Sequence, residues 1–178
     1  TYYLLGYLYS DGYINNKKGL INITSKDREI LEKLKPLIGD ISISSNKYGS
    51  YYIQWYSIKH IEELFQLGCV NNKSLILEYP NWINSDLEHH FIRGYFDGDG
   101  SIGLYNRKDR TSNNLSISIA GTVSMLNGIK NYINSKGSIR KLKRISVLSY
   151  HGNLSSSNFC NKIYSNASIF MQRKYNIY

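Results

Sequence analysis

The chain has 178 residues, a formal net charge of +9 and an isoelectric point near 9.4. Its content of 42% hydrophobic and 20% charged residues excludes a disordered chain, and no apolar run approaches the ~20 residues that a membrane helix needs. No basic region followed by an apolar core opens the sequence, so we expect no signal peptide. Cys69 and Cys160 lie in apolar stretches, which predicts reduced core thiols in an intracellular protein.

The positive charge is divided unevenly along the chain. Residues 1–89 hold 9 Lys and Arg against 10 Asp and Glu, a net charge of −1, whereas residues 90–178 hold 13 against 3, a net charge of +10. A basic half indicates a polyanionic partner, and the second half is expected to carry more of that contact. The alternative interpretation is that the surplus only favours solubility.

In chain order, the first half is predicted to form a helix, two strands, a helix, two strands and a helix. The first helix ends near residue 12, and Thr24 or Ser25 is expected to cap the second, which runs to about residue 38. Ser57 is expected to cap the third, which runs to residue 67. The strand-like stretches lie at 13–15, 20–24, 41–44 and 51–56.

A linker at 70–84, which contains Pro80, separates this set from a second set of the same elements. Ser85-Asp86-Leu87-Glu88 has the pattern of a capping box before an apolar helix. Later strands are expected at 115–119, 139–143 and 145–151.

The two halves repeat each other in sequence as well as in element order. Segment 4–12 matches segment 92–100, and Gly6 and Gly94, like Asp11 and Asp99, are 88 residues apart. A helical pattern at 30–38 recurs 95 residues later, so the second half has a longer loop at 105–114. We therefore predict an α+β fold with two halves, residues 1–84 and 85–178.

The repeated segments have the properties of a tightly packed helix pair. Gly6 and Ser10 share one helix face, as do Gly94 and Gly98, because residues four apart lie on the same face. Small residues at this spacing let two helix backbones approach closely.

Each of these helices is predicted to end in an aspartate, Asp11 or Asp99. The helix macrodipole disfavours a carboxylate at a C-terminus by roughly 0.3–1 kcal/mol, and two carboxylates held close would also repel each other. A divalent cation with oxygen ligands would compensate both effects. The alternative is that each Asp-Gly only marks a turn. An EF-hand is excluded, since Ile102 and Lys108 stand where it requires Gly and Glu.

The paired segments resemble the two motifs of monomeric LAGLIDADG homing endonucleases. The resemblance is close at 91–100, and weaker but in register at 4–12, where Tyr9 replaces the usual acid. Asn72-Lys73-Ser74, followed by Tyr79-Pro80-Asn81, is similar to the lysine-then-proline block of this family. Gln172-Arg173-Lys174-Tyr175 resembles its closing Arg-Lys element.

The resemblance implies two pseudosymmetric αββαββα halves, with the motif helices at the centre and two antiparallel sheets that form a DNA-binding saddle. It implies a monomer that cuts both strands of a long, asymmetric double-stranded DNA site by metal-assisted hydrolysis. Mg²⁺ is the expected cofactor; Mn²⁺ is expected to substitute for it, and Ca²⁺ to bind without supporting cleavage. No membrane partner is expected, and the location is bacterial or phage cytoplasm or an organelle such as the mitochondrion.

The same resemblance assigns roles to individual residues. Asp11 and Asp99 are the expected catalytic acids and metal ligands, with Ser10 and Gly98 beside them at the metal site. Lys73 and Lys174 are the expected catalytic cations, one per half, although each could instead be an ordinary surface lysine.

DNA contacts are expected from strands and hairpin loops, because Arg, Lys, Asn and Gln read base edges. Alternation along the strand at 51–56 places Gln54 and Tyr56 on the groove side and Ile53 and Trp55 on the core side. The candidates are Asn15, Lys17, Lys18, Asn22, Lys47, Tyr51, Gln54, Tyr56, Tyr105, Arg107, Lys108, Arg110, Asn113, Ser116, Arg140, Lys141, Lys143, Arg144, Ser149 and His151.

Two other functions fit the same fold. The protein could be an intron RNA maturase or a non-cleaving DNA-binding protein, in which case RNA or DNA would be bound without hydrolysis. The nuclease part of an intein is a further alternative. Because the chain lacks room for splicing segments and does not end in His-Asn, only an excised nuclease domain of an intein would fit.

The uneven charge yields a test on salt dependence. Neutralising Arg107, Lys108 and Arg110 should flatten the dependence of DNA affinity on salt more than neutralising Lys17 and Lys18, because each phosphate contact releases counterions. Binding measured over a range of salt concentrations checks this, and equal effects of the two sets would make the charge division incidental.

Overall fold

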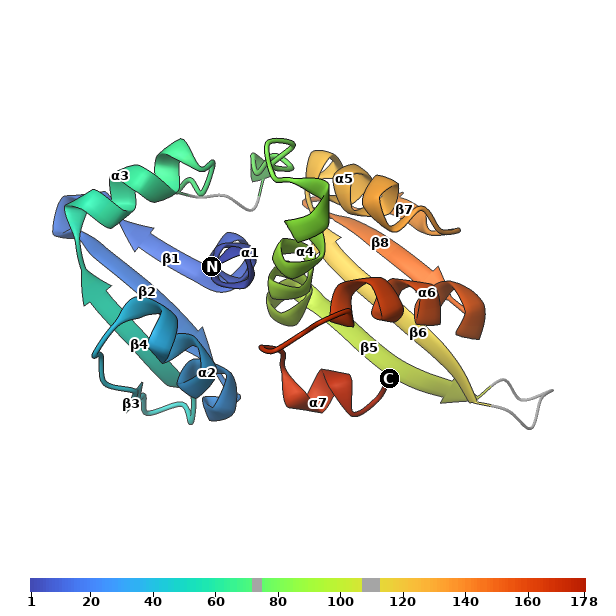
Figure 1. The fold of residues 1–178 in the computed structure, drawn as a ribbon, viewed down its shortest axis with the longest axis horizontal. Helices are drawn as coiled ribbons and strands as arrows, with labels where there is room; N and C mark the ends of the chain where they lie inside the picture. The colour runs from blue at the N-terminus through green and yellow to red at the C-terminus, as the bar shows by residue number, and fades with distance from the viewer. Residues whose placement is uncertain (72–74, 107–112) are drawn as a thin grey trace.

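The computed structural model describes residues 1–71, 75–106 and 113–178. Two sets of elements follow one another in the same order, helix, two strands, helix, two strands, helix, and a last short helix ends the chain (Figure 1). The first set is α1 (Tyr2–Asp11), β1 (Gly12–Asn15), a 3-10 turn η1 (Asn16–Lys18), β2 (Leu20–Ser25), α2 (Arg28–Ile38), β3 (Ser44–Ser45), β4 (Tyr51–Tyr56) and α3 (Ile58–Gln66). The second set is α4 (Ser85–Asp99), β5 (Gly100–Asn106), β6 (Asn113–Gly121), α5 (Val123–Ile133), β7 (Ser138–Lys141), β8 (Ser146–His151) and α6 (Asn153–Tyr164), followed by α7 (Gln172–Tyr175).

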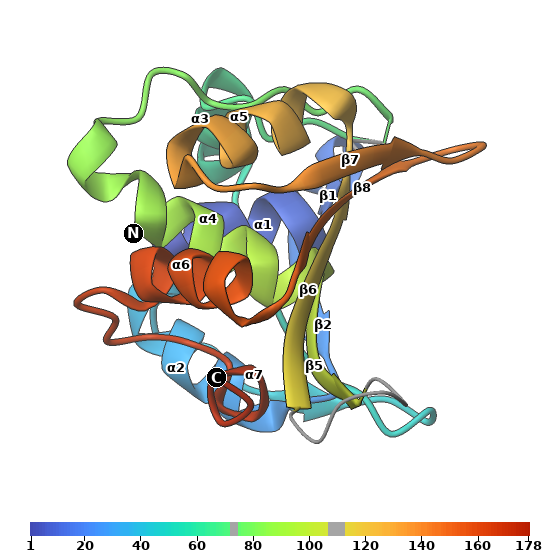
Figure 2. The same cartoon turned by 90° about the vertical axis from the view of Figure 1, so that its right-hand side faces the viewer.

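The strands form two four-stranded antiparallel sheets with equivalent topology. The first has the order β1-β2-β4-β3 and the second the order β5-β6-β8-β7. The helices cover one side of the sheets, and the strands form a curved wall on the other side (Figure 2). The predicted α+β class and the αββαββα order are confirmed, while the boundary between residues 84 and 85 stays a prediction.

The centre of the molecule is the pair α1 and α4. In both helices the residues along the contact are buried, namely Tyr3 and residues 5–9 in α1 and residues 91–97 in α4. A Cβ placed on Gly6 would lie 2.0 Å from the carbonyl oxygen of Phe91, and one placed on Gly94 would lie 2.0 Å from that of Tyr3. Because Phe91 is 88 residues after Tyr3, the two contacts are equivalent, and the helices are related by a pseudo-twofold axis.

The predicted helix starts needed two corrections. Ser25 still pairs with Tyr51 in the sheet, so it cannot cap α2; Asp27 stands at the cap, and the Ser25 hydroxyl accepts the Asp27 backbone N–H at 3.1 Å. The Ser85 capping box is also wrong, because Asn84 caps α4 by accepting the backbone N–H of Asp86 at 2.9 Å. The cap at Ser57 is confirmed.

One predicted strand is shorter than expected. Residues 41–43 follow Gly39, whose φ of 138° turns the chain, and only Ser44 and Ser45 pair with β4. Ile41 and Ile43 pack against the core instead of extending the sheet.

The C-terminal segment ties the two halves together. Arg173 on α7 forms an ion pair of 2.7 Å with Asp27 at the start of α2, and Lys33 Nζ of α2 donates to the carbonyl oxygen of Phe170 at 3.1 Å. Figures 1 and 2 both show α7 beside α2, although the two are far apart in sequence. Among the described residues, no helix combines the length and hydropathy needed to cross a bilayer.

The close helix contact predicts the effect of adding a single methyl group. Gly94→Ala should lower the free energy of unfolding by about 1–3 kcal/mol or more, because the new Cβ meets backbone that cannot move aside. Gly103→Ala is the matched control, since a Cβ placed there would have no described atom within 4 Å apart from its own residue and its chain neighbours. Urea unfolding followed by circular dichroism measures both, and equal stability of the two variants would contradict this packing.

Candidate active site and nucleic-acid interface

Asp11 and Asp99 are the last residues of α1 and α4, and both are exposed although the helices before them are buried. A Cβ on Gly98 would lie 3.3 Å from the Asp11 carboxyl carbon, so the two helix ends meet at this point. The pKa of Tyr95 is raised by burial and then by the nearby Asp99 and Asp11 carboxylates. The fold therefore brings both acids to one place on the surface, as their repeat predicted.

The negative helix ends lack compensation from their own helices. The last turns of α1 and α4 carry no basic residue, so the carboxylates stand where the macrodipole is unfavourable. This arrangement costs stability unless a positive group from elsewhere lies close to the two helix ends.

Lys174 supplies positive charge at the last turn of α4, next to this site. Its side chain is 1% exposed, and Nζ donates to the carbonyl oxygens of Phe96 at 2.6 Å, Asp97 at 2.8 Å and Gly100 at 2.5 Å. Burial lowers the pKa of Lys174 to about 8, while nearby aspartates, among them Asp99, oppose the shift. Lys174 is thus neither a surface cation nor open to solvent: it fixes the end of α4, and all three ammonium protons are used.

Asp97, the other acid of the second motif, points inward. Its Oδ2 accepts the Tyr3 hydroxyl at 2.6 Å and the Met171 backbone N–H at 2.8 Å. Burial raises the pKa of Asp97, although these hydrogen bonds and Lys174 favour the ionised form. Asp97 therefore connects α1, α4 and the C-terminal segment.

Tyr9 occupies the equivalent position in the first half and has an equivalent role. Its hydroxyl donates to the carbonyl oxygen of Leu67 at 2.5 Å, just after α3. Each motif thus anchors the segment that follows the last helix of its own half, one through an acid and the other through a phenol. The missing acid at Tyr9 does not remove this anchor.

The donor set fits a hard divalent cation only in part. Carboxylate and main-chain oxygens are the ligands that Mg²⁺ and Ca²⁺ prefer, and Asp11 and Asp99 provide the carboxylates. The described part of the chain contains no group of three or more His, Cys, Asp or Glu that could hold a metal ion. The remaining ligands would have to be water, main-chain carbonyls or a bound phosphate.

Two predicted metal-site residues belong to the helix contact. The Ser10 hydroxyl donates to the Tyr7 carbonyl oxygen at 3.0 Å and lies against Gly98. Because Gly98 has no side chain, only its carbonyl could ligate an ion. Lys73, Arg107, Lys108 and Arg110 lie outside the described residues.

The sheet side away from the helices carries most of the predicted DNA contacts. In β4, Gln54 and Tyr56 are exposed and Ile53 is buried, as predicted. Tyr51 is a correction, because it lies on the core side, where the Arg28 guanidinium is 5.7 Å from its ring. Tyr52 was not among the predicted contacts. It lies two residues before Gln54 on β4 and therefore faces the same side of the sheet.

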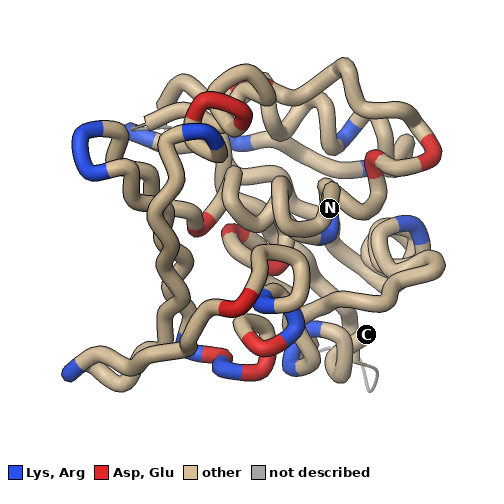
Figure 3. The backbone as a smooth tube through the Cα atoms, turned by 60° about the vertical axis from the view of Figure 1, so that its left-hand side comes forward, with Lys and Arg blue, Asp and Glu red and all other residues tan. Residues whose placement is uncertain are grey.

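The other predicted contacts lie on strands or loops at that side. The Asn15 side chain already makes a hydrogen bond within the protein, because its Oδ1 accepts the Lys18 backbone N–H at 3.1 Å. Exposed positions are Lys17, Lys18, Lys47, Asn113, Arg140, Lys141, Lys143, Arg144 and His151, and half-buried ones are Asn22, Tyr105, Ser116 and Ser149. Basic residues lie at the tips of loops that project beyond the strands as well as on the helices, and the strands themselves carry few charges (Figure 3).

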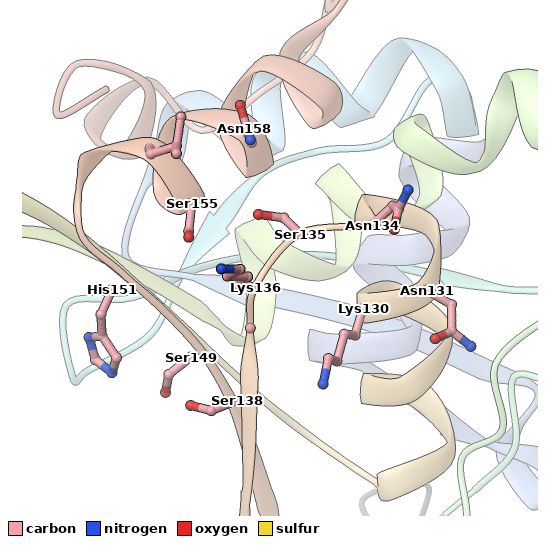
Figure 4. A pocket seen from close by; sticks show the side chains of 12 residues that line it. Lys130, Asn131, Asn134, Ser135, Lys136, Ser138, Ser149, His151, Ser155 and Asn158 are labelled. Atoms are coloured by element: carbon pink, nitrogen blue, oxygen red, sulfur yellow. The ribbon is translucent and has the colours of Figure 1, made fainter.

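A hollow of about 990 Å³ lies beyond the edge of the second sheet, between α5, β7, β8 and α6. Its side chains are mainly polar, including Lys130, Lys136 and His151 (Figure 4). Neither Asp11 nor Asp99 lines this hollow, so it is separate from the site formed by the two carboxylates.

The chain thus belongs to a class of proteins in which one polypeptide forms two equivalent halves. The halves meet at a pair of central helices, and a carboxylate ends each of these helices. Residues 1–73 match the LAGLIDADG-like domain family. Over its whole length the chain has the fold of three LAGLIDADG-type endonuclease structures. I-GzeII in complex with its DNA target gives a TM-score of 0.70 at 12% identity, covering 99% of this chain and 86% of that one. I-SmaMI bound to uncleaved DNA with calcium ions gives 0.67 at 15%, covering 98% and 87%. I-AabMI bound to uncleaved DNA gives 0.65 at 14%, covering 99% and 87%.

A sequence relative is the DNA-directed RNA polymerase subunit Rpo1C of Methanocaldococcus jannaschii, which is 27% identical over 131 residues. The match covers 70% of this chain but only 15% of that subunit. The resemblance recognised in the sequence is confirmed: the chain begins with a LAGLIDADG-like domain and has the fold of the two-domain LAGLIDADG endonucleases.

The buried position of Lys174 predicts a structural effect of its removal. Lys174→Met should lower the free energy of unfolding by roughly 3 kcal/mol, because three carbonyl oxygens lose their donor. Lys162→Met is the control, since Lys162 is exposed and donates one hydrogen bond, to the Tyr132 carbonyl, within the described part of the chain. A change within about 0.5 kcal/mol is expected. Urea unfolding decides between them, and an unchanged midpoint for Lys174→Met would show that these bonds contribute little.

Proposed function

We propose that the protein is a site-specific endonuclease that binds a long, asymmetric DNA duplex and hydrolyses one phosphodiester bond in each strand. The observation that carries the proposal is the pair of exposed carboxylates, Asp11 and Asp99, at the adjoining ends of two buried helices. Each carboxylate directly precedes the first strand of its own sheet. One duplex lying across both sheets would thus pass over both acids.

The carboxylates would act as ligands of divalent cations. Such cations, Mg²⁺ in our proposal with Mn²⁺ as a substitute, activate water and stabilise the charge of the attacking and leaving oxygens. The work of this chain is to hold Asp11 and Asp99 in fixed positions. The α1–α4 contact sets their separation, and Lys174 keeps the last turn of α4 in place.

The two strands of DNA are antiparallel, and the two halves of the chain are related by a pseudo-twofold axis. Each half can therefore present its carboxylate to a different strand, which makes a monomer sufficient for a double-strand break. We extend the proposal to the boundary between residues 84 and 85, and to Lys73 as the catalytic cation that the first half contributes.

The outward sheet faces and the basic loops supply the DNA contacts in this proposal. The β7–β8 hairpin exposes Arg140 and Lys141 at the end of β7, and Lys143 and Arg144 in the connection to β8. Lysine and arginine on such loops bind phosphates independently of sequence. In this proposal, polar strand residues such as Asn22 and Gln54 contact base edges. I-SmaMI and I-GzeII, which share this fold, are described as DNA complexes, and this supports double-stranded DNA as the partner.

A cleavage assay with isosteric amide variants tests the function. Asp11→Asn and Asp99→Asn should each lower double-strand cleavage by about 10²-fold or more, because the amide is a poor cation ligand. DNA affinity should be kept or should rise, since a negative charge facing phosphates is removed. The substrate is a plasmid carrying a site selected with the unchanged chain from a randomised duplex library in Mg²⁺.

Asp40→Asn is the matched control, because Asp40 is fully exposed and its nearest cation is Lys35 at 3.7 Å. It should cut at the unchanged rate. Full activity of both catalytic-site variants would overturn the proposal. Selective binding by the unchanged chain without nicking, in either Mg²⁺ or Mn²⁺, would favour a maturase or a non-cleaving DNA-binding protein.

A further inference from the structure

The outward faces of the two sheets differ in side-chain size at equivalent positions. In the first sheet, Tyr13 pairs with Asn22 and Asn22 pairs with Gln54, so these residues form one row across β1, β2 and β4, which we call the amide row. The flanking inward positions, among them Ile23 and Ile53, are fully buried, so the row faces away from the helices.

The second sheet carries a row of serines in the same place. Ser101 pairs with Ser118, Ser118 with Ser149, and Ser149 with Ser138, so four hydroxyl side chains lie side by side across all four strands. We call this the serine row. Only Ser149 among its members was recognised from the sequence.

The two rows are equivalent under the pseudo-twofold axis. Tyr13 stands two residues after Asp11, and Ser101 stands two residues after Asp99. Asn22 lies directly opposite Tyr13, as Ser118 lies opposite Ser101. Each row is therefore the first outward row next to the carboxylate of its own half.

The short side chains leave space on the second sheet. An open hollow of about 380 Å³ lies over its outward face, and its lining includes Ser101, Ser116, Ser118 and Gly103, with His151 at one side. At roughly 30 Å³ per molecule, such a volume holds on the order of ten waters.

We propose that the two halves read DNA unequally next to the cut: the amide row selects base pairs directly, and the serine row accepts many sequences. This inference rests on the proposed function and names the residues that set its specificity. The two sheet backbones lie at similar depths from the duplex because they are related by symmetry. A row that reaches base edges in the first half thus leaves a water-filled gap in the second.

The chemistry of the side chains supports the same division. The carboxamides of Asn22 and Gln54 each carry a donor and an acceptor and can form the two-bond contact that identifies adenine. The Asn22 Oδ1 also accepts the Thr24 hydroxyl at 2.9 Å, which orients this carboxamide and leaves one lone pair of the oxygen for a base. A serine hydroxyl is shorter, makes one bond in either sense, and contacts any base through water. Affinity in the second half would then come from phosphate contacts, which fits its net charge of +10 over residues 90–178.

A selection experiment with matched double variants tests the inference. A randomised duplex library is enriched for binding to the full chain in Ca²⁺, and base preferences are compared among the unchanged chain, Asn22→Ala/Gln54→Ala, and Ser118→Ala/Ser149→Ala. The amide variant should lose roughly tenfold of base preference at positions confined to one half-site. The serine variant should change preference by less than about twofold at every position.

The two variants remove equivalent pairs of outward side chains, so their thermal midpoints and their low-salt affinity for a random duplex serve as controls for folding and for phosphate binding. A serine variant that relaxes the opposite half-site as strongly as the amide variant relaxes its own would overturn the inference.

Failure of the proposed function gives a different result. If the unchanged chain selects duplexes but does not cut them in Mg²⁺ or Mn²⁺, the hydrolytic activity is contradicted, and the comparison of the two rows still stands. If it cuts the selected duplexes and both variants behave alike, only the inference on specificity is wrong.

Discussion

The direct backbone contact between α1 and α4 is the constraint on which the rest of the structure depends. Gly6 and Gly94 have no side chains, so each helix lies against carbonyl groups of the other, at Phe91 and Tyr3 respectively. This approach places the helix ends together, and with them Asp11 and Asp99. Since each helix leads directly into the first strand of its sheet, the same contact also fixes how the two sheets lie relative to one another. A looser helix pair would separate the acids and the sheets at once.

Two exposed acids at negative helix ends are unfavourable, and the polar groups beneath them limit this cost. Lys174 satisfies the last carbonyls of α4, and Asp97 holds both Tyr3 and the backbone of Met171. The C-terminal segment that carries these groups also contacts α2 in the other half, through Arg173 and Phe170. Elements from both halves therefore cooperate to keep the end of one helix rigid. Rigid positioning of this kind is what a preorganised functional site requires.

Much of this arrangement could be predicted from the sequence because it follows from local patterns and from a repeat. Spacing of small residues predicted the helix pair, and the doubled Asp-Gly predicted two acids together. Errors came where tertiary context competes with local preference. Ser25 is a residue type that often caps helices, but it remains in a strand. Residues 41–43 have the alternating pattern of a strand, but Ile41 and Ile43 pack on the core. Lysine is a residue type usually found at the surface, and Lys174 is buried because of where the fold places the C-terminal segment.

By itself, then, the sequence determined the element order, the helix pair and the identity of the two acids, because these depend on periodicity and on covalent neighbours. The tertiary structure decided which side chains share a row across a sheet, because register depends on pairing between strands far apart in the chain. Ser101, Ser118, Ser149 and Ser138 are separate serines in the sequence and a continuous surface in the fold. It also decided that Asp97 faces inward while Asp99, two residues later, faces solvent, since a helix turns by about 200° over two residues.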